Sequence, residues 1–248
     1  MIDARASVEV FDEIDSTNLE ARRRAERGEF GPVWLLARRL SAGRGRRGRA
    51  WISFDGNLFA TYLFDTERAP AEVALLGFAA GVAIAETMDA FCVVGAALKW
   101  PNDVLIGGAK AAGILIDSGA GRDGRLWVAL GLGVNVAVAP HALDRATTSL
   151  REKLPRGAEA PSAGAFFAGL RPRLEAWAAR LGDDGFEPLR HAWHARTHGL
   201  GSRVRILQGA EAIEGAIVGL SPRGELELDT AGGRRLIAAG DVHVVNVA

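Results

Sequence analysis

The chain has 248 residues, enough to bury one large core or one core with a small appended unit. Hydrophobic residues make up 48% of it and charged residues 24%, which excludes a disordered or fibrous protein. The 30 basic and 30 acidic side chains cancel, so no global field is expected to draw the protein to nucleic acid or anionic lipid. Any function that needs positive charge must therefore be local.

Targeting and redox signals are weak in this sequence. The N-terminal segment has early acids and lacks a continuous apolar run, so we expect no secretory signal. The most apolar stretch, residues 73–85, is followed by Glu86 and Asp89 and is expected to be too short to span a bilayer. The lone cysteine, Cys92, lies in an apolar run, which favours a buried structural thiol. We therefore expect a cytoplasmic enzyme or binding protein.

In chain order, the first half alternates expected strands and helices. Strands are predicted at 8–14, 33–40 and 57–64, and the N-cap residue types at 15–17 begin a helix that runs to Gly28. Pro70 opens a long helix that ends near residue 91. Short β-type runs, separated by Pro, Gly and Asp, predict a meandering mixed sheet; they lie at 97–100, 104–108, 112–117 and 127–136.

In the second half, the residue pattern changes from helical to β-type near the C-terminus. Residues 149–163 are polar with two prolines and are expected to form a loop, and helices are expected at 165–181, bent at Pro172, and at 187–196. After His198, short alternating strands with regular turn signals predict a small β-barrel. The break at Gly199–Gly201 predicts a first domain at 1–198 and a second at 199–248.

Three histidines, His191, His194 and His198, fall near helical spacing at the end of the expected helix at 187–196 and just after it. A metal site is one interpretation of this spacing. Because no further His or Cys lies close in the sequence, we favour a solvated helix face.

A glycine- and arginine-rich segment, GRGRRGR at 43–49, follows the second expected strand. Its glycines let the backbone approach a ligand, and its guanidinium groups are forked donors suited to phosphate and carboxylate. The four cations repel one another, so the empty loop is expected to be mobile and to be ordered by a nucleoside triphosphate or an acyl phosphate. A solvated basic loop or a nucleic-acid patch remains the alternative. The segment is not a Walker A loop, because it lacks the glycine-lysine-serine/threonine ending.

Two further motifs lie in the expected sheet. KWPND at 99–103 ends a strand in a polar turn, and a tight hairpin is expected to bring Asp103 close to Lys110. The carboxylate could hold magnesium or a ribose hydroxyl and the lysine could stabilise anionic charge, although a plain turn with a solvated lysine is the alternative. GLGVN at 131–135 ends a strand, and its glycines could admit a flat ligand or only mark the strand end.

Taken together and in this order, Ser16-Thr17-Asn18, GRGRRGR, KWPND, Lys110 with Gly113, and GLGVN resemble the biotin protein ligases over nearly the whole chain. The resemblance implies an α+β fold: a mixed β-sheet flanked by helices, as in class II synthetases and the biotin–lipoate ligase catalytic domain, with a small C-terminal SH3-like β-barrel. It also implies the monofunctional type, without the N-terminal DNA-binding domain of members that repress transcription.

The resemblance further implies a reaction and its residues. Biotin is activated by ATP, with Mg²⁺, to biotinyl-5′-AMP and passed to a lysine of a biotin carboxyl carrier protein, with no DNA partner. Independently of the resemblance, we expect no membrane partner, and an exposed sheet could support a homodimer. Arg44, Arg46 and Lys110 are the predicted catalytic residues. The implied biotin-binding residues are Ser16, Thr17, Asn18, Gly43, Arg44, Gly45, Arg46, Lys110 and Gly113. The implied ATP- or AMP-binding residues are Arg46, Arg49, Trp51, Lys99, Asn102, Asp103, Lys110 and Asn135, with Asp103 as the magnesium ligand.

One position departs from the family pattern. The family carries a glutamine that contributes to biotin binding three residues before the arginine–glycine motif, and here that position is Leu40. Loss of an amide that pairs with a buried polar ligand costs about 1–3 kcal/mol. Either Ser41 or another group compensates, or biotin binds more weakly, or the preferred acid differs. A lipoate-type protein ligase and, in another class, a nucleic-acid-binding protein are the competing functions.

Overall fold

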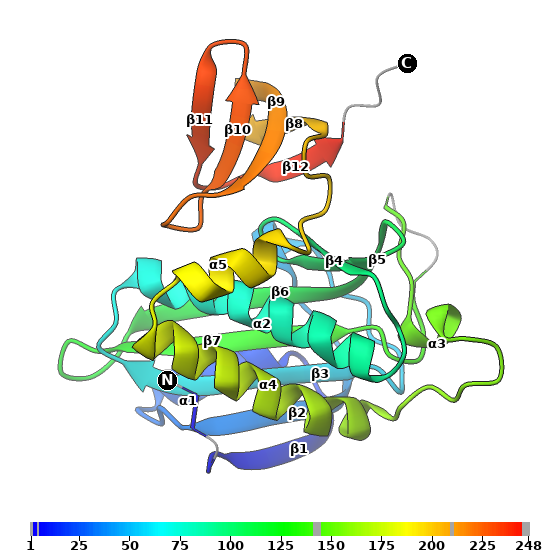
Figure 1. Cartoon of the computed structure of the whole chain (residues 1–248). Coiled ribbons are helices and arrows are strands. Elements are labelled where there is room, and N and C mark those ends of the chain that lie inside the picture. The colour runs from blue at the N-terminus through cyan, green and yellow to red at the C-terminus, as the bar shows by residue number, and fades with distance from the viewer. Residues whose placement is uncertain (1, 4, 141–144, 209–210, 245–248) are drawn as a thin grey trace.

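A seven-stranded mixed sheet forms the centre of the larger part of the molecule (Figure 1). The structure, a computed structural model, describes residues 2–3, 5–140, 145–208 and 211–244. The strand order is β1-β2-β3-β7-β6-β5-β4; β1 pairs in parallel with β2, and the other neighbours pair antiparallel. The strands are β1 (Ser7–Ile14), β2 (Val33–Leu40), β3 (Leu58–Thr66), β4 (Ala96–Lys99), β5 (Asp103–Ile106), β6 (Ala109–Ala120) and β7 (Leu126–Val134). The expected mixed sheet is confirmed.

Helices cover both faces of this sheet (Figure 1). On one face α1 packs against β2, β3 and β7 over a small apolar cluster that includes Leu35 and Leu63. On the other face α2 packs against the sheet, and α4 and α5 pack against α2. The helices are α1 (Thr17–Glu26), α2 (Pro70–Ala90), α3 (Leu150–Lys153), α4 (Ala163–Asp183) and α5 (Glu187–His194). The predicted helices are confirmed, and α4 continues through Pro172 as one element.

The long apolar helix α2 is a core helix. Its 21 residues are enough, by length and composition, to cross a membrane, so the expectation that this stretch is too short is wrong. The helix includes Glu86 and Asp89, and each has a partner: Glu86 Oε2 accepts from Trp177 Nε1 at 3.0 Å, and Asp89 pairs with Arg196 at 2.5 Å. Within its apolar window 67% is buried, against the sheet and α4. This packing accounts for the composition of α2.

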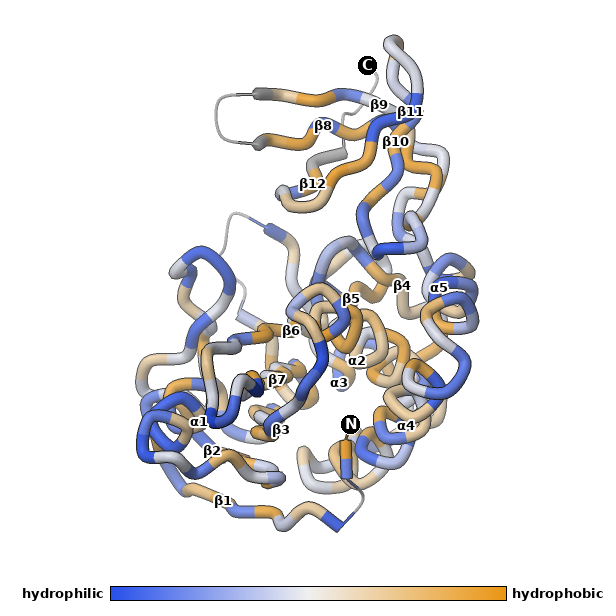
Figure 2. Tube along the Cα trace, turned by 90° about the vertical axis from the view of Figure 1, so that its left-hand side faces the viewer, coloured by the Kyte–Doolittle hydropathy of each residue, from blue (hydrophilic) through white to orange (hydrophobic). Residues whose placement is uncertain are grey.

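The C-terminal strands form a separate five-stranded antiparallel sheet, the element expected of a small SH3-like barrel (Figures 1 and 2). Its order is β11-β10-β9-β8-β12, with β8 (Arg203–Gln208), β9 (Glu211–Leu220), β10 (Leu226–Thr230), β11 (Gly233–Ile237) and β12 (Asp241–Val244). Trp100 Nε1 donates to the carbonyl oxygen of Gly224 at 3.2 Å, and the apolar core continues between the two sheets. The barrel is therefore packed on the larger part rather than tethered to it.

Two local predictions are wrong. The expected loop at 149–163 contains α3, a single helical turn in which Ser149 and Glu152 form a capping box; a helix of four residues is too short to leave a periodic signal. Cys92 is exposed, not buried. It follows the end of α2 with a φ of 61°, and this reversal of the chain turns it outward while Val93 packs inside.

Candidate functional site

A cavity of about 530 Å³ lies between the start of α1, the arginine loop (residues 43–49), the sheet and β12. Most of the residues predicted from the sequence line it: Ser16, Thr17, Asn18, Arg44, Gly45, Arg46, Arg49, Trp51, Lys99, Asn102, Asp103, Lys110 and Gly113. Asn135 lines a small adjoining cavity together with Trp51 and Lys110. Gly43 lines neither; its carbonyl oxygen accepts from Trp51 N at 2.9 Å. Segments far apart in the sequence thus meet at one cavity.

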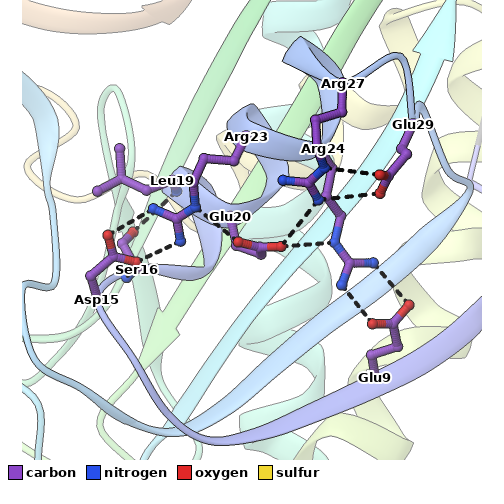
Figure 3. A network of polar contacts seen from close by, with 9 residues as sticks. All are labelled: Glu9, Asp15, Ser16, Leu19, Glu20, Arg23, Arg24, Arg27 and Glu29. Atoms are coloured by element: carbon purple, nitrogen blue, oxygen red, sulfur yellow. Dashed lines mark hydrogen bonds and ion pairs between the residues drawn. The ribbon is translucent and has the colours of Figure 1, made fainter.

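The first turn of α1 presents Ser16 and Thr17 at one end of the cavity, and a set of ion pairs braces this helix (Figure 3). Ser16 is the N-cap, and its Oγ accepts from Leu19 N at 3.5 Å. The preceding Asp15 accepts Ser16 N–H at 2.7 Å and holds both terminal nitrogens of Arg23, at 2.8 and 2.9 Å. The Arg23 guanidinium keeps the pKa of Asp15 below its usual range. The backbone that carries the two hydroxyls is therefore fixed before any ligand arrives.

Behind this turn lies a buried polar group on the sheet. Thr61 of β3 is fully buried, and its Oγ1 lies 2.7 Å from Thr17 Oγ1 and 2.7 Å from Asn18 Oδ1. Asn18 Nδ2 donates to Asp117 Oδ2 at 2.8 Å and to the carbonyl oxygen of Leu115 at 3.3 Å. The Asn18 amide therefore has protein partners for its oxygen and for both hydrogens.

The arginine loop is folded as a short turn with a 3-10 segment at Arg46–Gly48. Gly45 N donates to the carbonyl oxygen of Arg49 at 2.7 Å, which closes the turn at its base. Arg46 reaches the KWPND turn, where its Nη1 donates to Asn102 Oδ1 at 3.1 Å. Burial of Arg46 lowers the pKa of its guanidinium, a sign of the desolvation that this cation bears at the cavity.

Two arginines of the loop are held by the C-terminal barrel. Asp241, at the start of β12, pairs with Arg47 at 2.7 Å and with Arg49 at 3.1 Å. Burial alone would raise the pKa of Asp241, but the arginines, Arg49 first, hold it below its usual range. The mutual repulsion of the loop is thus relieved by a carboxylate 192 residues further along the chain. Among the described residues, no ion pair is found for Arg44 or Arg46.

Lys110 and Asp103 form a direct ion pair, as the predicted hairpin of β5 and β6 requires. Lys110 is only 8% exposed and also lies under the Trp51 ring, with its Nζ 5.4 Å from the ring centroid. Burial lowers the pKa of the Lys110 ammonium, and the Asp103 carboxylate opposes that shift. A single buried cation therefore lies on the cavity wall beside the cationic loop.

The glycines of the sheet admit protein side chains. A Cβ atom on Gly131 would lie 2.0 Å from Asn18 Oδ1, and one on Gly133 would lie 2.7 Å from the Trp51 ring. A Cβ atom on Gly113 would lie 3.0 Å from the Trp51 ring. The flat group that GLGVN was predicted to receive is, in this structure, the indole of Trp51. Asn135, 2% exposed, donates to the carbonyl oxygen of Thr148 at 3.1 Å, while its Oδ1 has no partner among the described residues.

Sequence reasoning missed three residues of this site: Thr61, Asp117 and Asp241. Thr61 left a signal, because a threonine inside the apolar run NLFATYLF needs a hydrogen-bond partner once that strand is buried. Asp117 and Asp241 left none, since their partners become neighbours only through the sheet order and the docking of the barrel. His191 and His194, by contrast, are exposed, and they contact Glu187 and the carbonyl oxygen of Val218.

A mixed sheet that carries a glycine-rich cationic loop and a buried lysine around one cavity is the architecture of an acid-activating protein ligase. The chain belongs to the biotin/lipoate A/B protein ligase family, whose model matches residues 11–136, and the biotin protein ligase C-terminal domain model matches residues 199–245.

Curated relatives and solved structures agree with this assignment. The chain is 38% identical over 232 residues to the biotin–[acetyl-CoA-carboxylase] ligase of Paracoccus denitrificans, covering 92% of this chain and 96% of that protein. The corresponding ligase of Mycobacterium tuberculosis is 33% identical, covering 95% of this chain and 88% of that protein. The biotin protein ligase of Aquifex aeolicus, solved with biotin and ATP, aligns with a TM-score of 0.80 and 25% identity, covering 96% of this chain and 98% of that one.

Proposed function

We propose that this protein is an ATP-dependent ligase that joins biotin to a lysine of a biotin carboxyl carrier protein through biotinyl-5′-AMP. The observation that carries the proposal is the single cavity that connects the hydroxyls of Ser16 and Thr17 with the cations Lys110 and Arg46. An acid can lie along such a cavity with its head group at α1 and its carboxylate at the cations. The relatives named for biotin–[acetyl-CoA-carboxylase] ligation support the choice of biotin and of a carboxylase carrier.

The first step joins the two anions. A carboxylate oxygen of biotin attacks the α-phosphorus of ATP, and the bond from that phosphorus to the bridging oxygen breaks, so that pyrophosphate leaves. Lys110 binds the carboxylate and then the acyl-phosphate oxygen, while Arg44 and Arg46 neutralise negative charge that grows on the phosphate. Because Lys110 is buried and Arg46 is partly buried, these two cations stabilise the transition state more than exposed cations would.

The second step needs no nucleophile from this chain. The lysine amine of the carrier attacks the carbonyl carbon of the mixed anhydride, the bond to the phosphate oxygen breaks, and AMP leaves as the amide forms. Placement of the two reactants supplies much of the rate increase. The arginine loop, with Gly43 and Gly45, closes over the adenylate and protects it from water. Gly113 keeps the wall beside Lys110 open.

We assign the nucleotide to the loop side of the cavity. Arg46, Arg49 and Lys99 face phosphates, and Trp51 faces the adenine; Asn102, Asp103 and Asn135 meet the ribose or the base. The described residues do not fit a magnesium ion held by the protein: they contain no group of three His, Cys, Asp or Glu side chains in metal-binding arrangement, and the Asp103 carboxylate is paired with Lys110. We therefore derive no step through magnesium.

We divide the chain into a catalytic domain at 1–198 and a barrel domain at 199–248. The matches of the two family models, at 11–136 and 199–245, support this division. A cytoplasmic location, a homodimer and the absence of a DNA partner are further parts of the proposal that follow from the sequence analysis.

The test is ATP–pyrophosphate exchange with biotin and, separately, with lipoate. We expect exchange that depends on biotin, and transfer of radiolabelled biotin to a purified carrier domain. Exchange with lipoate alone would contradict the choice of substrate. Tight binding to RNA or DNA that weakens steeply with salt, without exchange, would favour the nucleic-acid function instead.

A further inference from the structure

Four side chains from three separate segments form one line of hydrogen bonds at the head-group end of the cavity. Asp117 of β6 contacts the amide of Asn18, Asn18 contacts the hydroxyl of Thr61, and Thr61 contacts the hydroxyl of Thr17. Thr17 lines the cavity, and Thr61 lies fully buried behind it. We call this line, from Asp117 to Thr17, the relay.

The relay fixes the direction of each of its protons. The Asp117 carboxylate and the Leu115 carbonyl oxygen can only accept, so the Asn18 side that meets them is its NH₂ group. The oxygen of Asn18 therefore faces Thr61 and, having no hydrogen, must accept. Thr61 has one hydroxyl proton, which it donates to Asn18.

The contact between Thr61 and Thr17 decides which kind of hydrogen-bonding group Thr17 can bind in the cavity. Thr61 Oγ1 also lies 2.7 Å from Thr17 Oγ1, and a contact of this length between two hydroxyl oxygens needs a proton between them. Because the proton of Thr61 is already donated to Asn18, the proton of Thr17 must point to Thr61. Thr17 then offers only lone pairs to a ligand.

We propose that Asp117, Asn18 and Thr61 are positioning residues that make Thr17 a hydrogen-bond acceptor, so that the site selects an acid whose head group donates an N–H bond. This deepens the proposed function and rests on it, because the ureido ring of biotin carries such N–H groups. The lipoyl ring has no donor of this kind. Leu40 stands where the family pattern has an amide side chain. Thr17 therefore has a larger share in selecting the head group than it would have beside a second polar side chain at position 40.

The sheet register makes the relay possible. Thr61, Gly131 and Leu115 are neighbours across β3, β7 and β6. The Asn18 side chain lies over Gly131, where a Cβ atom would be 2.0 Å from its oxygen. Only glycine at this position lets one amide reach both flanking strands. Gly131 therefore serves the head-group end of the cavity.

The test compares two ligands by calorimetry: biotin, and its cyclic carbonate analogue, in which oxygen replaces both ureido N–H groups. An unmatched acceptor at Thr17 should make the wild-type protein prefer biotin by at least about tenfold. Thr61→Val removes the acceptor of the Thr17 proton, so Thr17 can rotate and donate to the analogue. We expect the ratio of the two affinities to fall by about tenfold or more.

Three variants separate the relay from a general loss of structure. Thr66→Val makes the same change on the same strand, at a buried hydroxyl that accepts only from Arg68 N among the described residues, and should leave both affinities as they are. Thr61→Ser keeps the hydroxyl and should restore the preference for biotin. Asp117→Ala, at a partly exposed position, should lower the ratio in the same direction, and its effect should not add to that of Thr61→Val.

The outcomes distinguish the two proposals. If the wild-type protein binds no biotin, both the proposed function and the ureido assignment are overturned. If biotin binds and Thr61→Val weakens biotin and the carbonate by the same factor, the relay is overturned while the function stands. A fall in the ratio that is absent from Thr66→Val supports the relay.

Discussion

The two ends of the cavity are built in opposite ways. At the head-group end, Thr17, Asn18 and Thr61 are buried and hydrogen-bonded to one another before any ligand is present. At the other end, the arginine loop is largely exposed, and Arg47 and Arg49 are paired with the carboxylate of Asp241 in the barrel. One end is buried and hydrogen-bonded within itself, and the other is exposed and held by ion pairs to a different part of the chain.

This difference matches the tasks that we assign to the two ends. Discrimination between acids needs fixed donors and acceptors, because a polar group that can rotate accommodates the wrong partner as well as the right one. Closure over a labile adenylate needs a segment whose charge is satisfied in both the open and the closed state. Lys110, which is buried and paired with Asp103, is the cation that we expect to stay in place while the loop closes over the adenylate.

The largest effect is expected where the two ends meet. Lys110→Ala should lower the rate of ATP–pyrophosphate exchange by about 10²–10³-fold, because the cation facing the developing charge is lost. The matched control is Lys153→Ala, an exposed lysine of α3 that does not line the cavity, which should leave the exchange rate unchanged. Wild-type exchange in a folded Lys110→Ala protein would remove this residue from the mechanism.

The charge of Lys110 also predicts a pH dependence with opposite signs for activity and stability. Because burial lowers the pKa of Lys110, the unfolded chain binds more protons than the folded protein between the two pKa values. The Lys110 contribution to the free energy of unfolding therefore rises with pH across that window, while activity falls as the lysine loses its charge. Asp103→Asn removes the carboxylate that opposes the shift and should move the alkaline limb of kcat to lower pH. A limb that does not move would show that another group controls it.

A substitution on β7 tests how closely the side chains at the head-group end of the cavity pack against the sheet. Gly131→Ala places a methyl group against Asn18 Oδ1 and should weaken biotin binding by about tenfold, with a loss of about 1–3 kcal/mol in the free energy of unfolding. Gly77→Ala in α2 is the control, because its new Cβ would meet Ile116 at an ordinary 3.5 Å. For each variant, calorimetry measures the affinity for biotin and urea unfolding measures the free energy of unfolding. Equal effects of the two substitutions would argue against a close fit at Gly131.

The smallest effect is expected at the contact between the loop and the barrel. Asp241→Asn should speed trypsin cleavage within residues 43–49 of the ligand-free protein by roughly two- to fivefold, since partly exposed ion pairs contribute little. Asp229→Asn, which breaks an exposed pair with Arg234 inside the barrel, is the control. The difference should vanish at high salt. Cleavage that is unaffected by Asp241→Asn would mean that the backbone turn alone holds the loop.

Much of the fold could be predicted from the sequence because its signals are local. Alternation in residues 8–14, the apolar run after Pro32, N-cap residue types at 15–17, and Pro70 each specify an element through neighbouring residues. The failures also have local causes. The turn at 150–153 is too short to show a period, and the outward position of Cys92 depends on a single backbone reversal after α2. The stretch at 73–85 is expected from the sequence to be too short to span a bilayer because Glu86 and Asp89 follow it, yet both lie within α2 and have partners outside that helix.

The sequence by itself determined the chemistry of the site: an arginine–glycine loop, a lysine in a hairpin and two adjacent hydroxyls are contiguous patterns whose residue types limit what they can bind. Only the tertiary structure decided how these groups are oriented. The proton direction at Thr17 depends on Thr61 and Asp117, and the state of the loop depends on Asp241, residues that lie far from them in the sequence. The physical reason is that hydrogen-bond polarity and charge neutralisation belong to pairs of groups, and these pairs form only when β3, β7, β6 and the barrel come together.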